Sequence, residues 1–268
     1  MRHQSELREK FFANGRADDC PVHDLHGHMG TFYGAHFPIA DASAMIRAMD
    51  RAGVKLLVFC SHAALLAPDV GNLGSIESVR RFPDKLRAYC AVNPNYPDVV
   101  KRDVETFDSY ADVYVGFKFL ADYHGRPMTD SGYQPAWELA NSRRLLVLIH
   151  TWGGSSYDGA EQVRTAAEKY PNANILVGHS IHGDWDSAIG LANEFPNVYL
   201  DLCAVVDERG ILERFVERVG SKKIVFGTDL PWFDLHYYIG AVLGADITDD
   251  DRRRIFYKNA EEILCSRL

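Results

Sequence analysis

The feature that most constrains the fold is a short apolar run, rich in β-branched residues, that recurs along the chain and stops at one polar residue. Four such runs end at the following residues: Lys118, His150, His179 and Asp229. An earlier run ends in Asp24-Leu25-His26-Gly27-His28. Runs that are apolar throughout are typical of buried parallel strands. Because parallel strands that close into a barrel gather their C-terminal ends on one face, the pattern predicts that these polar residues are neighbours at one end of a (β/α)8 barrel.

The chain alternates between expected strands and amphipathic segments. Strands are expected near residues 21–28, 54–60, 86–92, 113–119, 145–150, 174–179, 197–202 and 223–228. Helical patterns are expected over residues 41–50, 133–143, 158–170, 187–195 and 208–219. The segments Asn72-Leu73-Gly74 and Trp152-Gly153-Gly154 are interpreted as loops. Strict alternation predicts an α/β fold with a parallel sheet, and eight units in 268 residues favour a closed TIM barrel over an open eight-stranded sheet.

The ends of the chain are expected to add to one barrel. No linker or change of composition divides residues 1–268, so a single (β/α)8 barrel domain is predicted. Within it, residues 1–19 are interpreted as a polar N-terminal arm and residues 245–268 as C-terminal helices. Thr248, with Asp251 three residues later, predicts the start of one of these helices, and Asn259 is expected to cap the last.

Composition and charge limit the partners. A net charge of −8 and a pI near 5.7 argue against nucleic acid or an anionic membrane as the main partner. No apolar run approaches the ~20 residues of a transmembrane helix, and the charged N-terminus shows no secretory signal. The five cysteines form no Cys-x-x-Cys pair, which indicates a reducing, cytoplasmic compartment. Cys60, Cys90 and Cys203 lie in or just after expected strands and are interpreted as buried, inert thiols.

Two histidines on one expected strand indicate a metal site. Alternate residues of a strand point to one side, so Asp24, His26 and His28 share a face. Zinc and similar ions accept imidazole nitrogen and carboxylate oxygen, and catalytic sites keep a position for water. His150 would supply a third nitrogen and Asp229 an oxygen. A lone His-x-His is weak evidence, and a lone histidine at a strand end is more often structural. The site is predicted by the conjunction of these residues, each at the end of an expected strand.

Several segments resemble the amidohydrolase superfamily, and in detail its amidohydrolase-2 branch, over almost the whole chain. They are Asp24-Leu25-His26-Gly27-His28, Ala91-Val92-Asn93-Pro94, Gly116-Phe117-Lys118, Ile149-His150-Thr151, Gly178-His179, Phe226-Gly227-Thr228-Asp229-Leu230-Pro231 and Lys258-Asn259-Ala260. The resemblance implies one divalent metal ion, zinc in the first place and manganese or another ion as alternatives. It implies the following ligands: His26, His28, His150 and Asp229. It further implies that Asp229 accepts a proton and that His179 lies beside a metal-bound water.

Lys118 has more than one interpretation. In binuclear members of the superfamily, a lysine that ends strand four is carboxylated and bridges two metals. In the amidohydrolase-2 branch a lysine near this point recurs in mononuclear sites, and the resemblance favours this second role, as a catalytic group that contacts substrate. The structural alternative is a pairing with a carboxylate such as Asp24 or Asp201. Lys118 and Arg126 could together bind a substrate carboxylate.

Other residues near the expected strand ends have open roles. Aromatic side chains there could hold a planar or apolar molecule, or only pack the loops onto the barrel: Phe32, Tyr33, Tyr123, Trp152, Tyr157, Trp232 and Phe233. His182 stands where relatives often carry small residues, and it either enters the site or lies at the surface. His23 is expected to point away from Asp24 and is interpreted as structural.

Together these features predict a metal-dependent hydrolase that cleaves a C–N or C–O bond of a small amide, ester or lactone through a metal-activated water. The alternative at the same metal is a lyase, a non-oxidative decarboxylase of a small carboxylic acid, aromatic acids included. Decarboxylases that resemble this site are usually longer than this chain, which favours the hydrolase. A metal-free relative and a non-enzymatic binding protein are weaker alternatives, because none of the expected positions is degraded. Dimers are common among relatives, so a homodimer is one expectation.

Overall fold

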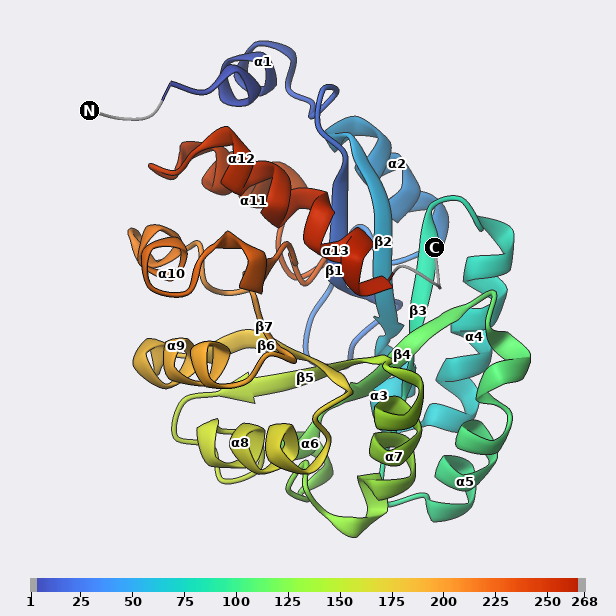
Figure 1. Ribbon diagram of the computed structural model, residues 1–268. Coiled ribbons are helices and arrows are strands. Elements are labelled where there is room, and N and C mark those ends of the chain that lie inside the picture. The colour runs from blue at the N-terminus through green and yellow to red at the C-terminus, as the bar shows by residue number, and fades with distance from the viewer. Residues whose placement is uncertain (1–3, 265–268) are drawn as a thin grey trace.

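The computed structural model describes residues 4–264, and its centre is a ring of eight parallel strands in sequence order. The strands are β1 (Val22–Met29), β2 (Val54–Ser61), β3 (Leu86–Ala91), β4 (Tyr114–Phe119), β5 (Leu146–Trp152), β6 (Asn174–His182), β7 (Val198–Asp201) and β8 (Ile224–Val225). Figure 1 shows the strands at the centre of the molecule. All eight expected strands are present, and the predicted α/β barrel is confirmed.

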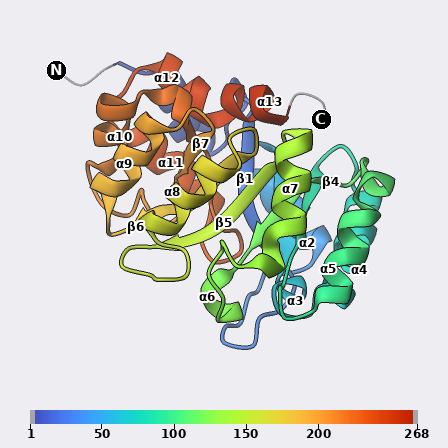
Figure 2. The same cartoon turned by 60° about the horizontal axis from the view of Figure 1, so that its bottom comes forward.

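Helices cover the outside of the ring, as Figure 2 shows for the segments between β3 and β8. The α-helices are α1 (Glu6–Asn14), α2 (Ala42–Ala52), α3 (His62–Leu66), α4 (Pro68–Arg81), α5 (Pro97–Glu105), α6 (Ala121–His124), α7 (Gln134–Arg143), α8 (Ala160–Lys169), α9 (Trp185–Glu194), α10 (Ile211–Val219), α11 (Leu235–Gly244), α12 (Asp249–Arg253) and α13 (Asn259–Leu264). Shorter turns are η1 (Phe107–Tyr110), η2 (Ser131–Tyr133), η3 (Ser221–Lys223) and the π-helical η4 (Arg254–Lys258). In the part of the chain that is described, no helix is both long and apolar enough to cross a bilayer.

The ring is completed by residues 226–230, which follow β8 and are called the closure segment below. Leu25 donates its backbone N–H to Phe226, and Asp229 donates to the carbonyl of His26 at 2.6 Å. A parallel bridge between Gly27 and Leu230 continues this contact. These bonds distinguish a closed barrel from the open sheet that the sequence left as an alternative.

Side chains of each strand divide between two buried clusters. On β5, Val147 and Ile149 pack outward against the helices, whereas Leu146 and Leu148 join the smaller cluster inside the barrel. Because side chains alternate along a strand, His150 continues the inward row of Leu148 and reaches the mouth of the barrel. The alternation therefore carries the polar strand ends to one place.

Helix ends follow the local sequence in most places. Asp41 caps α2 through the backbone of Ala44, and Gly53 ends that helix with a left-handed φ of 85°. The expected capping box of Thr248 and Asp251 is present at α12. The expected N-cap at Asn259 is wrong, because the helix continues from η4 into α13 with Asn259 in helical conformation.

The side chain of Asn259 instead donates to the carbonyls of Ser221 and Ile224, at 2.7 Å each, and so ties the last helix to β8. The final residues of the helix predicted there, 265–268, lie outside the described part of the chain. Residues 1–19 contain α1, which packs beside α11 and α12 (Figure 1). Ser5 Oγ donates to Asp249 Oδ1 at 2.6 Å and holds α1 to α12.

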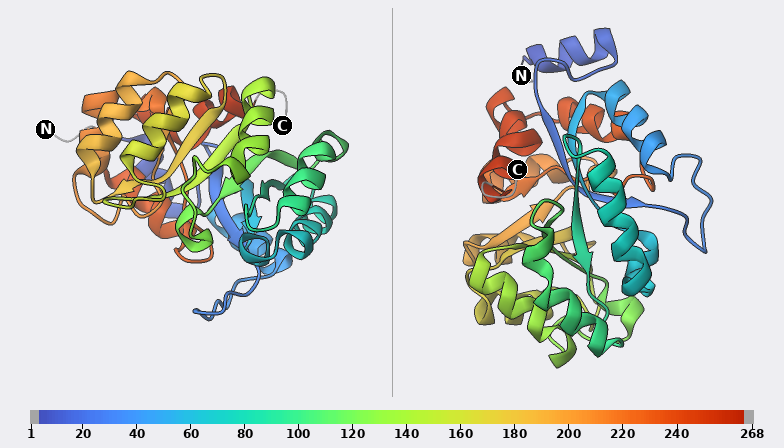
Figure 3. Two further views of the ribbon diagram at one scale, coloured as in Figure 1. Left: turned by 90° about the horizontal axis from the view of Figure 1, so that it is seen from below. Right: turned by 90° about the vertical axis from the view of Figure 1, so that its right-hand side faces the viewer.

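The interpretation of residues 72–74 as a loop is wrong, since they lie inside α4. A side chain at Gly71 would overlap the backbone of Ala63 and Ala64, so a glycine there allows α3 and α4 to approach closely. The loop between β1 and α2, by contrast, extends from the barrel end (Figure 3). Its Phe32 and Phe37 pack against Trp232, with ring centroids 5.3 and 4.8 Å apart.

Candidate metal centre

Two histidines of β1 and one aspartate of the closure segment converge at the mouth of the barrel. Asp229 Oδ1 lies 3.2 Å from His28 Nε2 and 3.6 Å from His26 Nε2. One ligand atom from each of these three residues lies within 4.8 Å of the other two. The structure therefore brings together three of the four predicted metal ligands.

The hydrogen bonds of the two imidazole rings indicate which nitrogens face this point without a proton. His26 Nδ1 is 2.7 Å from Asp201 Oδ2, and His28 Nδ1 is 3.2 Å from the carbonyl of Cys60. Both partners are acceptors, so each Nδ1 carries the hydrogen and each Nε2 presents a lone pair. Burial lowers the pKa of His26 well below its usual value, which keeps that ring neutral.

Asp229 Oδ1 faces these lone pairs, and no hydrogen-bond donor meets it among residues 4–264. Electron-rich atoms turned toward one another favour a cation between them. Histidines that hold a metal generally donate their other ring N–H to a carboxylate or a carbonyl, as His26 and His28 do here. The donor set thus fits a divalent metal ion.

His150 lines the same cavity but has a different neighbour. Its Nδ1 is 3.0 Å from His179 Nε2, and its potential ligand atoms group with those of Asp122 and Asp158 rather than with His26 and His28. The role of His150 as fourth ligand stays a prediction. Asp158, which the sequence did not single out, is fully buried, and burial raises its pKa to about 6.

Asp201 and Asp24 support the centre from behind. Asp201 Oδ2 accepts from His26 and also from the backbone N–H of His179, at 3.2 Å. Asp24 accepts from the Thr228 hydroxyl at 2.5 Å and from the Thr228 backbone N–H at 3.1 Å, which joins β1 to the closure segment. Burial raises the pKa of Asp24 to about 8. The sequence offered a signal for Asp201, because it too is the polar residue that ends an apolar strand.

Lys118 is buried at the inner end of the cavity, and its Nζ lies 3.2 Å from His26 Nε2. Burial lowers the pKa of this amine, so less of it is protonated than of a surface lysine. The hydrogen bonds described for Lys118 do not include the suggested pairing with Asp24 or Asp201. Lys118 thus faces the ligand atoms and the cavity.

The cavity over these residues has a volume of about 290 Å³ and largely aromatic walls. Five of the seven aromatic residues predicted at the rim line it: Phe32, Tyr123, Trp152, Trp232 and Phe233. Tyr33 is 79% exposed and Tyr157 37% exposed, and neither lines the cavity. Arg126 is also outside the lining and bonds to Asn95, so the suggested pair of Lys118 and Arg126 does not form in this structure.

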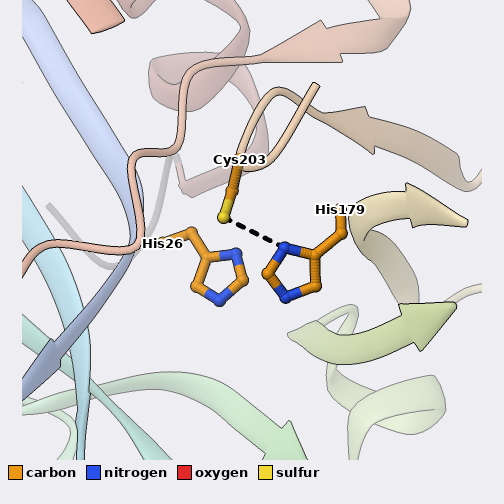
Figure 4. Close-up of side chains that lie close together, drawn as sticks. All are labelled: His26, His179 and Cys203. Atoms are coloured by element: carbon orange, nitrogen blue, oxygen red, sulfur yellow. Dashed lines mark hydrogen bonds between the residues drawn. The ribbon is translucent and has the colours of Figure 1, made fainter. Parts of the chain in front are cut away.

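His179 lies between His150 and the thiol of Cys203, as Figure 4 shows for the thiol side. Cys203 Sγ is 3.0 Å from His179 Nδ1. His182 does not enter the site, since it is not among the residues that line the cavity. Its Nδ1 bonds to the carbonyl of Ala204, and its ring packs on Trp152 with the ring centroids 4.2 Å apart. His23 packs near Tyr257, as expected of a structural residue.

Left-handed backbone occurs at two predicted catalytic positions. Asp229 has a φ of 62°, and His179, Ser180 and Ile181 have φ values of 63°, 48° and 54°. Such conformations are costly for residues with side chains and persist where surrounding contacts impose them. Here Ser180 Oγ donates to the carbonyl of Asp201 at 2.6 Å. The backbone in the last residues of β6 is thus held in a form that turns His179 toward the cavity.

Comparison with known proteins identifies a family and a fold. A family model described as "Amidohydrolase" matches residues 24–264. Comparison with curated proteins finds no match. Among solved structures, 2,6-dihydroxybenzoate decarboxylase complexed with 2,6-dihydroxybenzoate is similar with a TM-score of 0.74 and 14% identity, over 92% of this chain and 99% of that one.

Two further decarboxylase structures are similar over 92% of this chain and 96% of their own. The 5-carboxyvanillate decarboxylase of Novosphingobium aromaticivorans DSM 12444, complexed with manganese and a nitrobenzoic acid, has a TM-score of 0.71 and 12% identity. The dihydroxybenzoic acid decarboxylase of Polaromonas sp. JS666, with bound manganese and the inhibitor 2-nitroresorcinol, has a TM-score of 0.70 and 15% identity. At these identities the likeness shows a shared fold.

Proposed function

The chain belongs to the amidohydrolase family, whose model it matches over residues 24–264, and on this premise we propose that it is a metal-dependent decarboxylase of a small aromatic carboxylic acid. The observation that carries the proposal is the cavity itself, which combines aromatic walls with a metal-type donor set at its inner end. Similar structures named as decarboxylases of dihydroxybenzoate and 5-carboxyvanillate support the same substrate class.

This proposal reverses the order in which the sequence ranked the two reactions. The hydrolase was favoured because decarboxylases of the branch are usually longer. The match extends over 96–99% of the three decarboxylase chains, so a short chain is a weak argument against decarboxylation. The comparisons therefore favour the lyase, which the sequence placed second.

The metal would be held by His26, His28 and Asp229, with His150 as the fourth predicted ligand. When bound, a divalent ion supplies Lewis acidity that draws electron density from a substrate oxygen. Manganese is bound in two of the similar structures, so we propose manganese beside zinc as the ion to test first.

The residues of the cavity would orient an aromatic acid. Trp152, Trp232 and Phe233 offer flat apolar surfaces for the ring. Lys118 Nζ and His179 Nε2 are nitrogen groups from different strands that can hydrogen-bond a carboxylate or a ring hydroxyl. In an enclosed site these bonds are stronger than in water, because the local dielectric constant is lower.

Asp229 is the group that we propose to carry the proton. In decarboxylation the bond from ring to carboxylate breaks, CO2 leaves, and the electron pair that stays on the ring carbon takes a proton. Asp229 Oδ1 has no hydrogen-bond donor among the described residues, and the side chain lines the cavity. Its carboxylate can therefore take up a proton from a hydroxyl group of the substrate and pass it to a ring carbon above it.

The test is release of CO2 from 2,6-dihydroxybenzoate, 5-carboxyvanillate and related hydroxybenzoates by protein loaded with manganese or zinc. We expect CO2 and the decarboxylated phenol in equal amounts. Asp229→Asn should lower the rate at least ~100-fold, the usual range for loss of a general acid. His182→Asn, whose side chain lies outside the cavity lining, is the matched control and should retain activity.

Hydrolysis of amides, esters or lactones is measured in parallel with the same metal-loaded preparations. Acid production from such substrates without CO2 from any aromatic acid would overturn the proposal in favour of the hydrolase. Equal activity of the Asp229→Asn protein would overturn the role given to that side chain.

A further inference from the structure

We propose that the buried thiol of Cys203 positions His179, by donating a hydrogen bond to Nδ1 and so fixing the ring as the tautomer with hydrogen on Nε2. His179 then presents an N–H donor to the cavity and to the substrate, and does not act as a base. The identity of that substrate rests on the proposed function, whereas the tautomer does not.

The contact itself is close and enclosed. Cys203 Sγ lies 3.0 Å from His179 Nδ1, and Figure 4 shows the sulfur pointing at that nitrogen beside the ring of His26. Cys203 is fully buried and His179 is 4% exposed. Water therefore has little access to compete for this nitrogen.

The backbone on both sides of the thiol is fixed. Leu202 donates its N–H to the carbonyl of Val225, and Ala204 donates its N–H to the Tyr238 hydroxyl at 2.8 Å. His179 is held from its own side by the bond from its N–H to Asp201 Oδ2. The segment of Cys203 is thus anchored to β8 and α11, and the bond to Asp201 ties His179 to the same segment, which sets the distance between sulfur and ring.

The direction of the hydrogen bond follows from the chemistry of the pair. Both side chains are buried, which disfavours the charged form of each and leaves a neutral thiol beside a neutral ring. A neutral imidazole has one N–H and one bare nitrogen. The thiol can donate to the bare nitrogen, which places the ring hydrogen on Nε2.

A cysteine at this position has the opposite effect to the usual carboxylate partner. A carboxylate accepts from Nδ1–H, leaves Nε2 bare and stabilises the positive ring, as in a general base. A thiol donates to Nδ1 and leaves Nε2 as a donor. The residue type therefore decides whether His179 gives or takes a hydrogen.

The Nε2–H donor has a place to act. In this structure it faces His150 Nδ1 at 3.0 Å. If the lone pair of His150 Nδ1 binds a metal, the N–H of His179 becomes free to bond a substrate oxygen. His179 lines the cavity in which that oxygen would lie. A fixed donor at that position stabilises negative charge that develops on the oxygen.

The first experiment reads the tautomer directly, by ¹⁵N NMR of the histidine ring nitrogens in metal-free and zinc-loaded protein, with His179 assigned by the spectrum of His179→Gln. We expect hydrogen on Nε2 in the wild type and in Cys203→Ser, which keeps a donor. Cys203→Ala should give a mixture of tautomers, and Cys203→Asp should move the hydrogen to Nδ1. Cys90→Ala, a buried thiol outside the cavity lining, is the matched control.

The second readout is kinetic. Cys203→Ala should lower kcat for aromatic-acid decarboxylation about tenfold with little change in KM, and Cys203→Ser should restore most of the loss. Hydrogen on Nδ1 in the wild type, or a folded Cys203→Ser protein as impaired as Cys203→Ala, would overturn the inference. The expected tautomers without any CO2 release would support this inference and overturn the proposed function alone.

Discussion

At the scale of single residues, Asp201 is the side chain whose loss should weaken metal binding without removing a ligand. It accepts the Nδ1 hydrogen of His26 and so makes Nε2 more basic. We expect Asp201→Asn to lower metal affinity about 10- to 100-fold, as changes to such supporting carboxylates usually do. The measurement is competition for zinc or manganese against a chelator of known affinity.

Asp207→Asn makes the same chemical change six residues later at an exposed position, and it should leave the affinity unchanged. If Asp201→Asn binds metal as tightly as the wild type does, the hydrogen bond to His26 has no part in holding the ion.

His23 should contribute to loss of stability in acid. Burial lowers its pKa from 6.5 to about 4, and its Nδ1 has no hydrogen-bond partner in the described structure. The folded state therefore resists protonation that the unfolded chain accepts, so this contribution to stability is present above pH 6.5 and is lost as the pH falls toward 4. Denaturant unfolding of the wild type and of His23→Leu at pH 7.5, 5.5 and 4.5 measures it.

As the pH falls from 7.5 to 4.5, we expect the free energy of unfolding of His23→Leu to rise relative to that of the wild type by roughly 2 kcal/mol. This is less than the full pKa difference implies, because the ring is partly exposed. A constant difference at all three pH values would contradict the assignment.

The sequence was a good guide to which residues converge at the barrel mouth. It was a poor guide to the hydrogen-bond partners that orient their side chains. His26, His28 and Asp229 could be found because strand ends and a period of two depend on local pattern alone. The partners of their rings are set by contacts across the barrel, such as Asp201 to His26, which are 175 residues apart. Cys203 is buried, as the sequence predicted, but its contact with His179 is likewise set by the fold and has no local signal.

At the scale of elements, the closure segment leaves no room for a side chain at Gly227. A methyl group there would overlap Asp201 Oδ1 and lie 2.8 Å from His26 Cβ. We expect Gly227→Ala to lower the free energy of unfolding by about 1–3 kcal/mol, the range for overpacked positions, and to weaken metal binding as well. Thermal unfolding and metal titration of the same preparation measure both effects.

Gly190→Ala is the matched control. This glycine lies in α9 with open space around it, so alanine should raise stability by about 0.5–1 kcal/mol through helix propensity. If Gly227→Ala is as stable as the wild type and binds metal normally, the closure segment is less tightly packed than its geometry indicates.

Strands were easier to predict than helices in this chain. Buried parallel strands are apolar throughout, so a run such as residues 145–149 identifies itself. The glycine in Asn72-Leu73-Gly74 favoured a loop on local grounds, yet the segment lies inside α4, where Gly71 allows close packing on α3. Likewise Asn259 is a good cap by residue type, but its amide bonds to the carbonyls of Ser221 and Ile224 decided its position. Tertiary contacts overrode local preference at both sites.

At the scale of the whole molecule, a bound metal ion should raise the stability of the folded barrel in addition to any part it has in activity. A ligand that binds only the folded state adds about 2.7 kcal/mol when its free concentration is 100 times Kd. We expect Tm to fall on treatment with a chelator and to recover on addition of zinc or manganese. Plasma mass spectrometry should find about one ion per chain, as a mononuclear site requires.

His28→Ala should lose this response, because it removes a proposed ligand, while His182→Ala should keep it. A Tm that is the same with and without metal in the wild type would contradict the site. About two ions per chain would instead favour a carboxylated Lys118 that bridges them.

The closed ring also affects the rate at which the protein unfolds. Asp24 and Thr228 are 204 residues apart in the chain, yet their hydrogen bonds help to close the barrel. Contacts of such separation carry a large loop-closure cost, so they are expected to form after the folding transition state. Interactions made late affect the unfolding rate far more than the folding rate. An ion bound by both β1 and the closure segment would therefore slow unfolding and prolong the lifetime of the folded chain. The folding rate would stay almost unchanged.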